Sequence, residues 1–148
     1  MIYFKPVASS DVESVIKLMQ AFYAIDKYPF DVDKSKKLVI TFLENENLGS
    51  AWLIYFENEI VGYIILTFIF SFEYQGRIGF LDELYLLEKA RGKGIGAKAI
   101  DFIQEEALKL KLKVIYLEVE KHNKNAQKLY IASDFVSHNR KLMKYTVK

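Results

Sequence analysis

The spacing of apolar residues divides the chain into helical and extended stretches. From Val12 to Tyr23 apolar side chains recur every three or four residues, which predicts an amphipathic helix. Ser10 precedes this stretch and Glu13 follows three residues later, a pattern typical of a capping box at a helix start. The same spacing predicts further helices over residues 33–43, 95–110 and 123–132.

The remaining stretches are rich in β-branched and aromatic residues, which favour strands. Glu57-Asn58-Glu59 separates two of them and fits a hairpin turn. Strands are predicted over residues 2–5, 52–56, 60–72, 78–87, 114–119, 135–136 and 142–147. The order β-αα-βββ-α-β-α-ββ differs from the strict alternation of a doubly wound fold and predicts an α/β (α+β) mixture.

The chain has 148 residues, the size of one compact domain, and we expect a single domain over residues 1–148. It has no cysteine, which excludes disulfides, thiolate metal sites and a covalent intermediate on a protein thiol. His122 and His138 stand at no ligand spacing, so both are expected at the surface and no metal site is predicted.

Charge and hydropathy exclude two classes of partner. A formal net charge of +2 is too small to indicate nucleic-acid binding. The longest apolar stretch, residues 60–72, is shorter than the roughly 20 residues that a membrane-spanning helix needs. The first residues lack the layout of a signal peptide. We therefore expect a cytoplasmic protein that does not bind a membrane.

A glycine-rich turn is the strongest chemical feature of the sequence. Gly92, Gly94 and Gly96 stand between a predicted strand and a predicted helix. Without side chains there, an anion can approach the free N–H groups of the helix's first turn, where the helix dipole favours negative charge. Arg91 and Lys93 add positive charge. The turn therefore predicts a phosphate or pyrophosphate site.

Three other interpretations of this turn fit the sequence less well. The phosphate-loop pattern of nucleotide triphosphatases is absent. A dinucleotide fingerprint fits better, because Gly92-x-Gly94-x-x-Ala97 has its relaxed form and Glu118 stands near the expected ribose-binding acid. Only about 30 residues follow Glu118, however, too few for the rest of a doubly wound sheet. A plain chain reversal would need neither three glycines nor flanking cations.

Arg91-x-x-Gly94-x-Gly96 resembles the cofactor motif of the GNAT superfamily, the GCN5-related N-acetyltransferases. The strand over residues 80–86, Leu117-Glu118-Val119 and the run from Asn123 to Tyr130 also resemble this family, and Asp134 stands where members usually have glycine. The likeness covers essentially the whole chain. It implies one twisted mixed sheet of about six to seven strands flanked by about four helices.

The resemblance implies that acetyl-coenzyme A is the cosubstrate and that the reaction needs no metal. Arg91 and the backbone amides that follow it would bind the pyrophosphate. These amides belong to Gly92, Lys93, Gly94, Ile95, Gly96 and Ala97. The pantetheine arm would run along Leu84, Tyr85 and Leu86, where a β-bulge would free one N–H, that of Leu86, for the thioester carbonyl. Asn123 and Ala126 would border the arm from its other side.

Acetylation of an amine requires a base and an acid. An alkylamine at neutral pH is unprotonated in only about one molecule in 10³. The resemblance places Tyr130 as the acid that meets the departing thiolate. Asp82 and Glu83 are equal candidates for the base, and because neighbouring strand residues face opposite ways, only one of them is expected to face the acceptor. Glu73 is a candidate acceptor-binding carboxylate.

The acceptor side is predicted more coarsely. Aromatic residues between the first two helices, Phe22, Tyr23, Tyr28 and Phe30, are candidates for its walls. The strand carboxylates favour a cationic acceptor, either a small amine, with some likeness to polyamine and diamine acetyltransferases, or a protein amine. Without cysteine, transfer is expected to be direct, in a ternary complex. A non-catalytic acyl-coenzyme A-binding regulator is the alternative, and a homodimer is left open.

Overall fold

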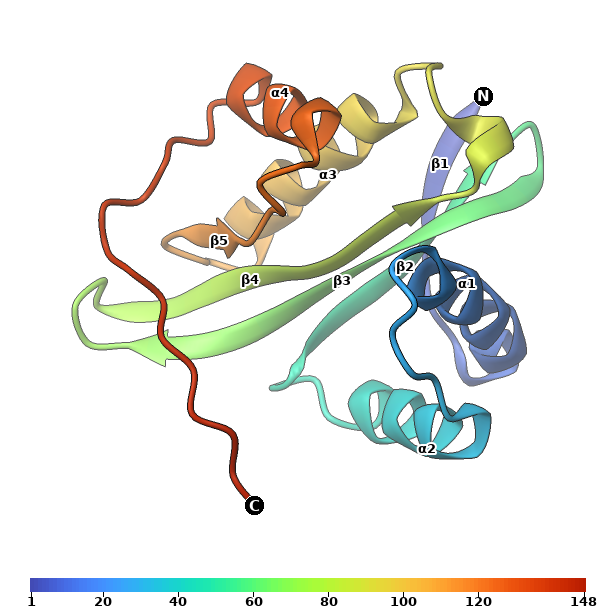
Figure 1. The fold of residues 1–148 in the computed structure, drawn as a ribbon, viewed down its shortest axis with the longest axis horizontal. Coiled ribbons are helices and arrows are strands. Elements are labelled where there is room, and N and C mark those ends of the chain that lie inside the picture. Colours follow the sequence, from blue (N-terminus) through green and yellow to red (C-terminus); the bar gives the residue numbers. More distant parts are fainter. The chain divides into compact units, whose positions relative to one another are not determined.

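The computed structural model describes all of residues 1–148 and divides into two compact units, residues 1–118 and 119–148. The first unit holds a five-stranded sheet and three longer helices (Figure 1). Its elements are β1 (Ile2–Pro6), a 3₁₀ turn (Ser9–Asp11), α1 (Val12–Ile25), α2 (Val32–Leu43), β2 (Gly49–Phe56), β3 (Glu59–Ser71), β4 (Gly76–Leu86), a second 3₁₀ turn (Glu88–Ala90), α3 (Ile95–Lys109) and β5 (Ile115–Leu117).

The sheet has the order β1-β2-β3-β4-β5. Its first four strands are antiparallel neighbours, and β5 is parallel to β4. The mixed sheet and the α+β class are therefore as the sequence predicts, although the sheet has five strands and not six or seven. The antiparallel part explains why its strands follow one another along the chain, since short turns can join them.

The helices of the first unit cover both faces of the sheet (Figure 1). On one face, α1 and α2 pack over a core that includes Leu53, Tyr63 and Tyr85. On the other face lies α3, where the Phe102 ring stacks on Phe4 at 4.4 Å and meets Trp52 edge-on at 5.3 Å. Leu53 and Trp52 are neighbours in β2, so the alternation of side chains along that strand supplies both cores.

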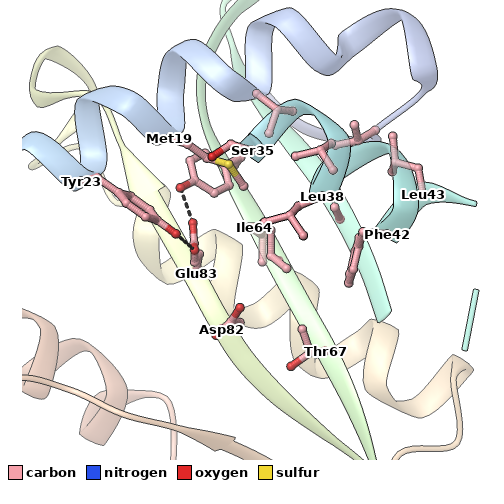
Figure 2. A pocket seen from close by; sticks show the side chains of 16 residues that line it. Met19, Tyr23, Ser35, Leu38, Phe42, Leu43, Ile64, Thr67, Asp82 and Glu83 are labelled. Carbon is pink, nitrogen blue, oxygen red and sulfur yellow. Dashed lines mark hydrogen bonds between the residues drawn. The ribbon is translucent and has the colours of Figure 1, made fainter. Parts of the chain in front are cut away.

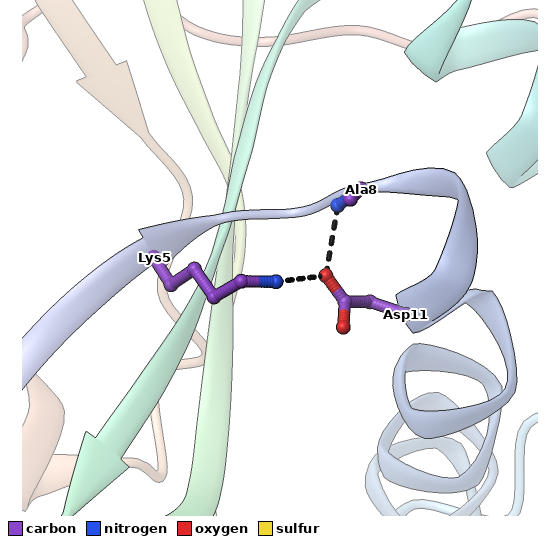
Figure 3. A network of polar contacts seen from close by, with 3 residues as sticks. All are labelled: Lys5, Ala8 and Asp11. Carbon is purple, nitrogen blue, oxygen red and sulfur yellow. Dashed lines mark hydrogen bonds and ion pairs between the residues drawn. The ribbon is translucent and has the colours of Figure 1, made fainter.

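The start of α1 differs from the predicted capping box. The Ser10 and Glu13 side chains do not cap it; instead the Asp11 carboxylate accepts a hydrogen bond from the Ala8 N–H at 2.9 Å and an ion pair from Lys5 at 2.5 Å (Figure 3). The hydrogen bond from Lys5 and that from Ala8 lower the pKa of Asp11. The 3₁₀ turn over Ser9–Asp11 makes Asp11, rather than Ser10, the residue before α1, and its carboxylate bonds back to the start of that turn and not to the helix.

The second unit contains one helix, α4 (Lys124–Ala132), which begins where predicted. The expected strands over residues 135–136 and 142–147 are absent, and the chain after α4 has no regular helix or strand. Alternating apolar residues describe only the side chains, whereas a strand also needs a hydrogen-bonded neighbour. At the end of α4, Asp134 adopts φ 71°, the left-handed conformation expected where relatives have glycine.

None of the helices is both long and apolar enough to cross a membrane.

Candidate active site

The glycine-rich turn leads directly into α3 with its backbone free of side-chain partners. Gly92 and Gly94 have φ of 75° and 78°, and a Cβ at either position would meet nothing within 4 Å. These glycines therefore serve the left-handed backbone, and the space beside them is open. The first hydrogen bond within α3 runs from the Lys98 N–H to the Gly94 carbonyl at 3.2 Å.

The first turn of α3 consequently has unsatisfied donors. The N–H groups of Ile95, Gly96 and Ala97 precede the first intrahelical bond. Gly94 cannot cap them with a side chain, and the first turn contains no acidic residue. Free amides, the positive end of the helix dipole and an open approach together can bind an anionic group.

Arg91 is fixed between this turn and the end of β4. Its Nε donates a hydrogen bond to the Leu86 carbonyl at 3.1 Å, and its guanidinium lies 5.8 Å from the centre of the Tyr85 ring. Lys93 is placed differently, with its ammonium 5.3 Å from the centre of the Phe56 ring. Arg91 therefore holds its positive charge beside the exposed end of β4.

The second half of β4 has one unpaired edge. The Leu87 N–H donates to the carbonyl of Val61 in β3. Because N–H groups alternate in direction along a strand, those of Leu84 and Leu86 point away from β3. On that side β5 pairs only with Gly79–Leu81. The two parallel strands thus separate after Leu81, and the N–H groups of Leu84 and Leu86 face the opening between them.

The bulge of β4 does not lie where it was expected. Leu84, Tyr85 and Leu86 pair with β3 in regular register, whereas the pairing slips between Ile65 and Leu66 and leaves Asp82 as the extra residue of β4. The unpaired N–H of Leu86 therefore follows from the separation of β4 and β5.

A cavity of about 240 Å³ lies between α1, α2 and the sheet, entirely within the first unit (Figure 2). Both candidate base residues, Asp82 and Glu83, line it. Strict alternation would turn these neighbours to opposite faces, but the bulge at Asp82 breaks the alternation and brings both to one side. Both carboxylates therefore line one cavity, which the strict alternation expected along this strand would not allow.

Two tyrosines hold the Glu83 carboxylate inside this cavity. The Tyr23 hydroxyl donates to one of its oxygens at 2.6 Å, and the Tyr63 hydroxyl donates to the other at 2.5 Å (Figure 2). Burial raises the pKa of Glu83, the two hydrogen bonds lower it, and the charge of Asp82 raises it again, with an upward result. Burial and the neighbouring carboxylate also raise the pKa of both tyrosines, so they remain protonated donors.

Asp82 has a different environment. It reaches solvent, and no hydrogen bond or ion pair to it is seen in this structure. The protein around it removes part of its hydration, which raises its pKa, and the negative charge of Glu118 raises it further. Both carboxylates in the cavity thus have a raised pKa, but only that of Glu83 accepts hydrogen bonds from tyrosine hydroxyls.

The other predicted acceptor residues are less closely placed. Tyr23 lines the cavity, whereas Tyr28 is exposed in the connection between α1 and α2. Phe22 stacks on Tyr85 at 5.0 Å and Phe30 meets Tyr23 edge-on at 5.3 Å. Neither phenylalanine lines the cavity. Glu73 is exposed in the turn between β3 and β4, roughly 20 Å along the hairpin from Glu83 at the usual rise per residue.

Tyr63 was missed by the sequence analysis. It stands in the apolar run of β3 and is only 1% exposed. A buried tyrosine hydroxyl almost always has a hydrogen-bond partner, so a tyrosine within a fully apolar strand indicates a polar group beneath the surface.

In the second unit, Asn123 caps α4. Its side-chain oxygen accepts a hydrogen bond from the Ala126 N–H at 3.1 Å, so two predicted cofactor residues contact each other. Tyr130 is half-buried, meets Phe135 edge-on at 5.8 Å, and burial raises its pKa. The structure places no group of three His, Cys, Asp or Glu side chains where they could share a metal ion.

Comparison with known proteins identifies this architecture. Residues 14–135, most of the chain, match the family model described as "Acetyltransferase (GNAT) family". The chain belongs to the GNAT family of acetyltransferases. An acetyltransferase of this family is what the sequence resemblance implied.

Three similar proteins illustrate the relationship. An uncharacterized N-acetyltransferase of Archaeoglobus fulgidus is 25% identical over 126 residues, which are 84% of this chain and 86% of that protein. An integron cassette protein from the metagenome of Cole Harbour Salt Marsh is 29% identical with a TM-score of 0.89, covering 98% of this chain and 90% of its own. A predicted acetyltransferase of Clostridium acetobutylicum, solved with acetyl-CoA, shares the fold at 18% identity, with a TM-score of 0.81 and coverage of 98% and 96%.

Proposed function

We propose that this GNAT protein transfers the acetyl group of acetyl-coenzyme A directly to a primary amine, within a ternary complex, and that Glu83 removes the amine proton. One observation carries the proposal: a carboxylate of raised pKa, fixed by two tyrosine hydroxyls, lines a cavity bordered by β4. The proposal treats residues 1–148 as a single acetyltransferase domain.

At the cosubstrate end, the free amides from Gly92 to Ala97 bind the pyrophosphate, and Arg91 adds charge beside them. The pantetheine arm extends along the open edge of Leu84 to Leu86 and pairs with it as an added strand would. The Leu86 N–H then donates to the thioester carbonyl and stabilises the negative charge that develops on its oxygen. The family resemblance assigns Asn123 and Ala126 to the cosubstrate as well.

At the acceptor end, the amine arrives as an ammonium ion, attracted by Asp82 and Glu83. Glu83 has lone pairs left after accepting from two tyrosines, so it can also take a proton from nitrogen. The freed nitrogen attacks the thioester carbon, the C–N bond forms and the C–S bond breaks, and the nitrogen then releases a second proton to give the neutral amide. Tyr130, to which the family resemblance assigns this role, protonates the departing thiolate and is reprotonated by the proton that the nitrogen releases.

Initial rates of thiol release from acetyl-coenzyme A, measured while amine and cosubstrate are both varied, test this mechanism. Direct transfer is expected to give intersecting double-reciprocal lines, and parallel lines would contradict it. Tyr130→Phe is expected to lower kcat by about 10²-fold while leaving binding of coenzyme A unchanged. Binding of coenzyme A without thiol release for any amine would instead indicate a regulatory protein.

The Tyr63 hydroxyl provides a test of Glu83 as the base. Its hydrogen bond stabilises the charged carboxylate and lowers the pKa of Glu83, so Tyr63→Phe should raise that pKa. Because the base must be unprotonated, the acid limb of the profile of kcat/KM against pH should then move to higher pH. Tyr55→Phe, on β2 and away from the cavity wall, is the matched control. An acid limb that stays in place in Tyr63→Phe would show that another group titrates there.

A further inference from the structure

The acceptor cavity changes character from one end to the other. Tyr23 and Glu83 lie at one end, and Phe42 and Leu43 at the other (Figure 2). Asp82 adds its carboxylate to the first region. The walls of the second are supplied by α2, through the side chains of Leu38, Val39, Phe42 and Leu43. Beyond the reach of the carboxylates, the cavity therefore offers a ligand mainly hydrocarbon.

Its size limits what can enter. A volume of about 240 Å³ corresponds to roughly eight groups of the size of a water molecule. Apart from Asp82 and Glu83, none of the side chains that line the cavity carries a charge. A ligand that fills the cavity therefore has one cationic end and an uncharged body of about six to eight heavy atoms.

We propose that the acceptor of this protein is a small apolar primary monoamine, an alkylamine or arylalkylamine, with its ammonium at Asp82 and Glu83 and its hydrocarbon body against α2. This inference rests on the function proposed above and adds the class of the acceptor. It differs from the polyamine-like acceptor that the strand carboxylates alone suggest. A second ammonium group at the far end of a diamine would lose much of its hydration among Val39, Phe42 and Leu43, which line the cavity and are buried or half-buried, without gaining a partner.

A series of amines tests the apolar body. From propylamine to hexylamine, kcat/KM for thiol release should rise about fourfold with each methylene, because each buries apolar surface. 1,5-Diaminopentane has the length of hexylamine but carries an ammonium in place of the terminal methyl, and it should be more than tenfold poorer. Equal rates for propylamine, hexylamine and the diamine would overturn the inference, as would faster acetylation of a short lysine peptide than of hexylamine.

A variant can reverse the preference. The Leu38 side chain lines the cavity but is 63% exposed, so Leu38→Asp introduces a charge without burying it in the core. The new carboxylate should partner the second ammonium and lower the ratio of hexylamine to diaminopentane activity by at least about fivefold. Ile40→Asp is the matched control, since Ile40 is on the same helix, is 45% exposed and does not line the cavity.

The two proposals can fail separately. If no amine accelerates thiol release although coenzyme A binds, the proposed function fails. If amines are acetylated but Leu38→Asp and Ile40→Asp change the ratio of hexylamine to diaminopentane activity equally, the proposed function stands and the acceptor does not bind in the apolar cavity. A thermal shift with hexylamine as the probe adds a readout independent of catalysis: hexylamine should stabilise the unmodified protein, and diaminopentane should stabilise it less.

Discussion

Glu83→Gln should lower kcat/KM for amine acetylation about 10²- to 10⁴-fold, the usual loss when a general base is removed. Glutamine keeps the shape of the side chain and can still exchange hydrogen bonds with the Tyr23 and Tyr63 hydroxyls that hold Glu83. It cannot take a proton from an ammonium. Binding of coenzyme A should stay unchanged, because the contacts proposed for it along β4 and at α3 are backbone amides, which the substitution retains.

Two further substitutions separate the base from general electrostatics. Asp82→Asn removes an equal charge from the same cavity and should cost about tenfold, through weaker attraction of the ammonium. Glu73→Gln removes a carboxylate at the exposed β3–β4 turn and should cost little. Equal losses in Glu83→Gln and Asp82→Asn would mean that the two residues act only as negative charge. Rates that recover at high pH in Glu83→Gln would support the base, since a larger fraction of the amine is then already unprotonated.

The fold was predictable where the pattern is long and strict. The helices from Val12 and from Ile95 begin at the predicted residues, because an amphipathic stripe of several turns admits few other structures. The short strands after α4 were predicted from residue types over a few positions and are absent. The predicted capping box at Ser10 was wrong for a local reason. A 3₁₀ turn over Ser9–Asp11 makes Asp11, and not Ser10, the residue before α1.

The candidate site shows the same division. The glycine-rich turn and its free amides could be predicted because they depend on backbone conformation and residue type at one place in the chain. The arrangement of Asp82 and Glu83 could not, since a β-bulge depends on how β3 and β4 pair. Nor could the two tyrosine hydroxyls, which come to Glu83 from 60 and 20 residues away. The packing of α1 on the sheet sets the contact from Tyr23, and the pairing of β3 with β4 sets the contact from Tyr63.

Ala97→Glu is expected to improve the helix and to damage the enzyme. Ala97 is exposed in the first turn of α3, which has no acidic residue, so a carboxylate there should stabilise the helix by about 0.3–1 kcal/mol through its dipole. The same carboxylate competes for the amides proposed to bind pyrophosphate and repels it. At about 6 Å and an effective dielectric constant of about 20, the repulsion per charge pair is about 3 kcal/mol, or about 100-fold in the Kd for coenzyme A.

Ala97→Glu should raise stability while it weakens coenzyme A binding, and this combination is more informative than a loss of binding alone. A variant that binds coenzyme A poorly because it is damaged would melt at a lower temperature, whereas Ala97→Glu should melt at the same or a higher temperature. Ala97→Gln is the control, because it adds similar bulk without charge and should retain most of the affinity. Calorimetric titration with coenzyme A together with thermal unfolding measures both quantities. If Ala97→Glu binds coenzyme A as tightly as Ala97→Gln does, the start of α3 is not the pyrophosphate site, since a fixed negative charge beside bound phosphate cannot leave its affinity unchanged.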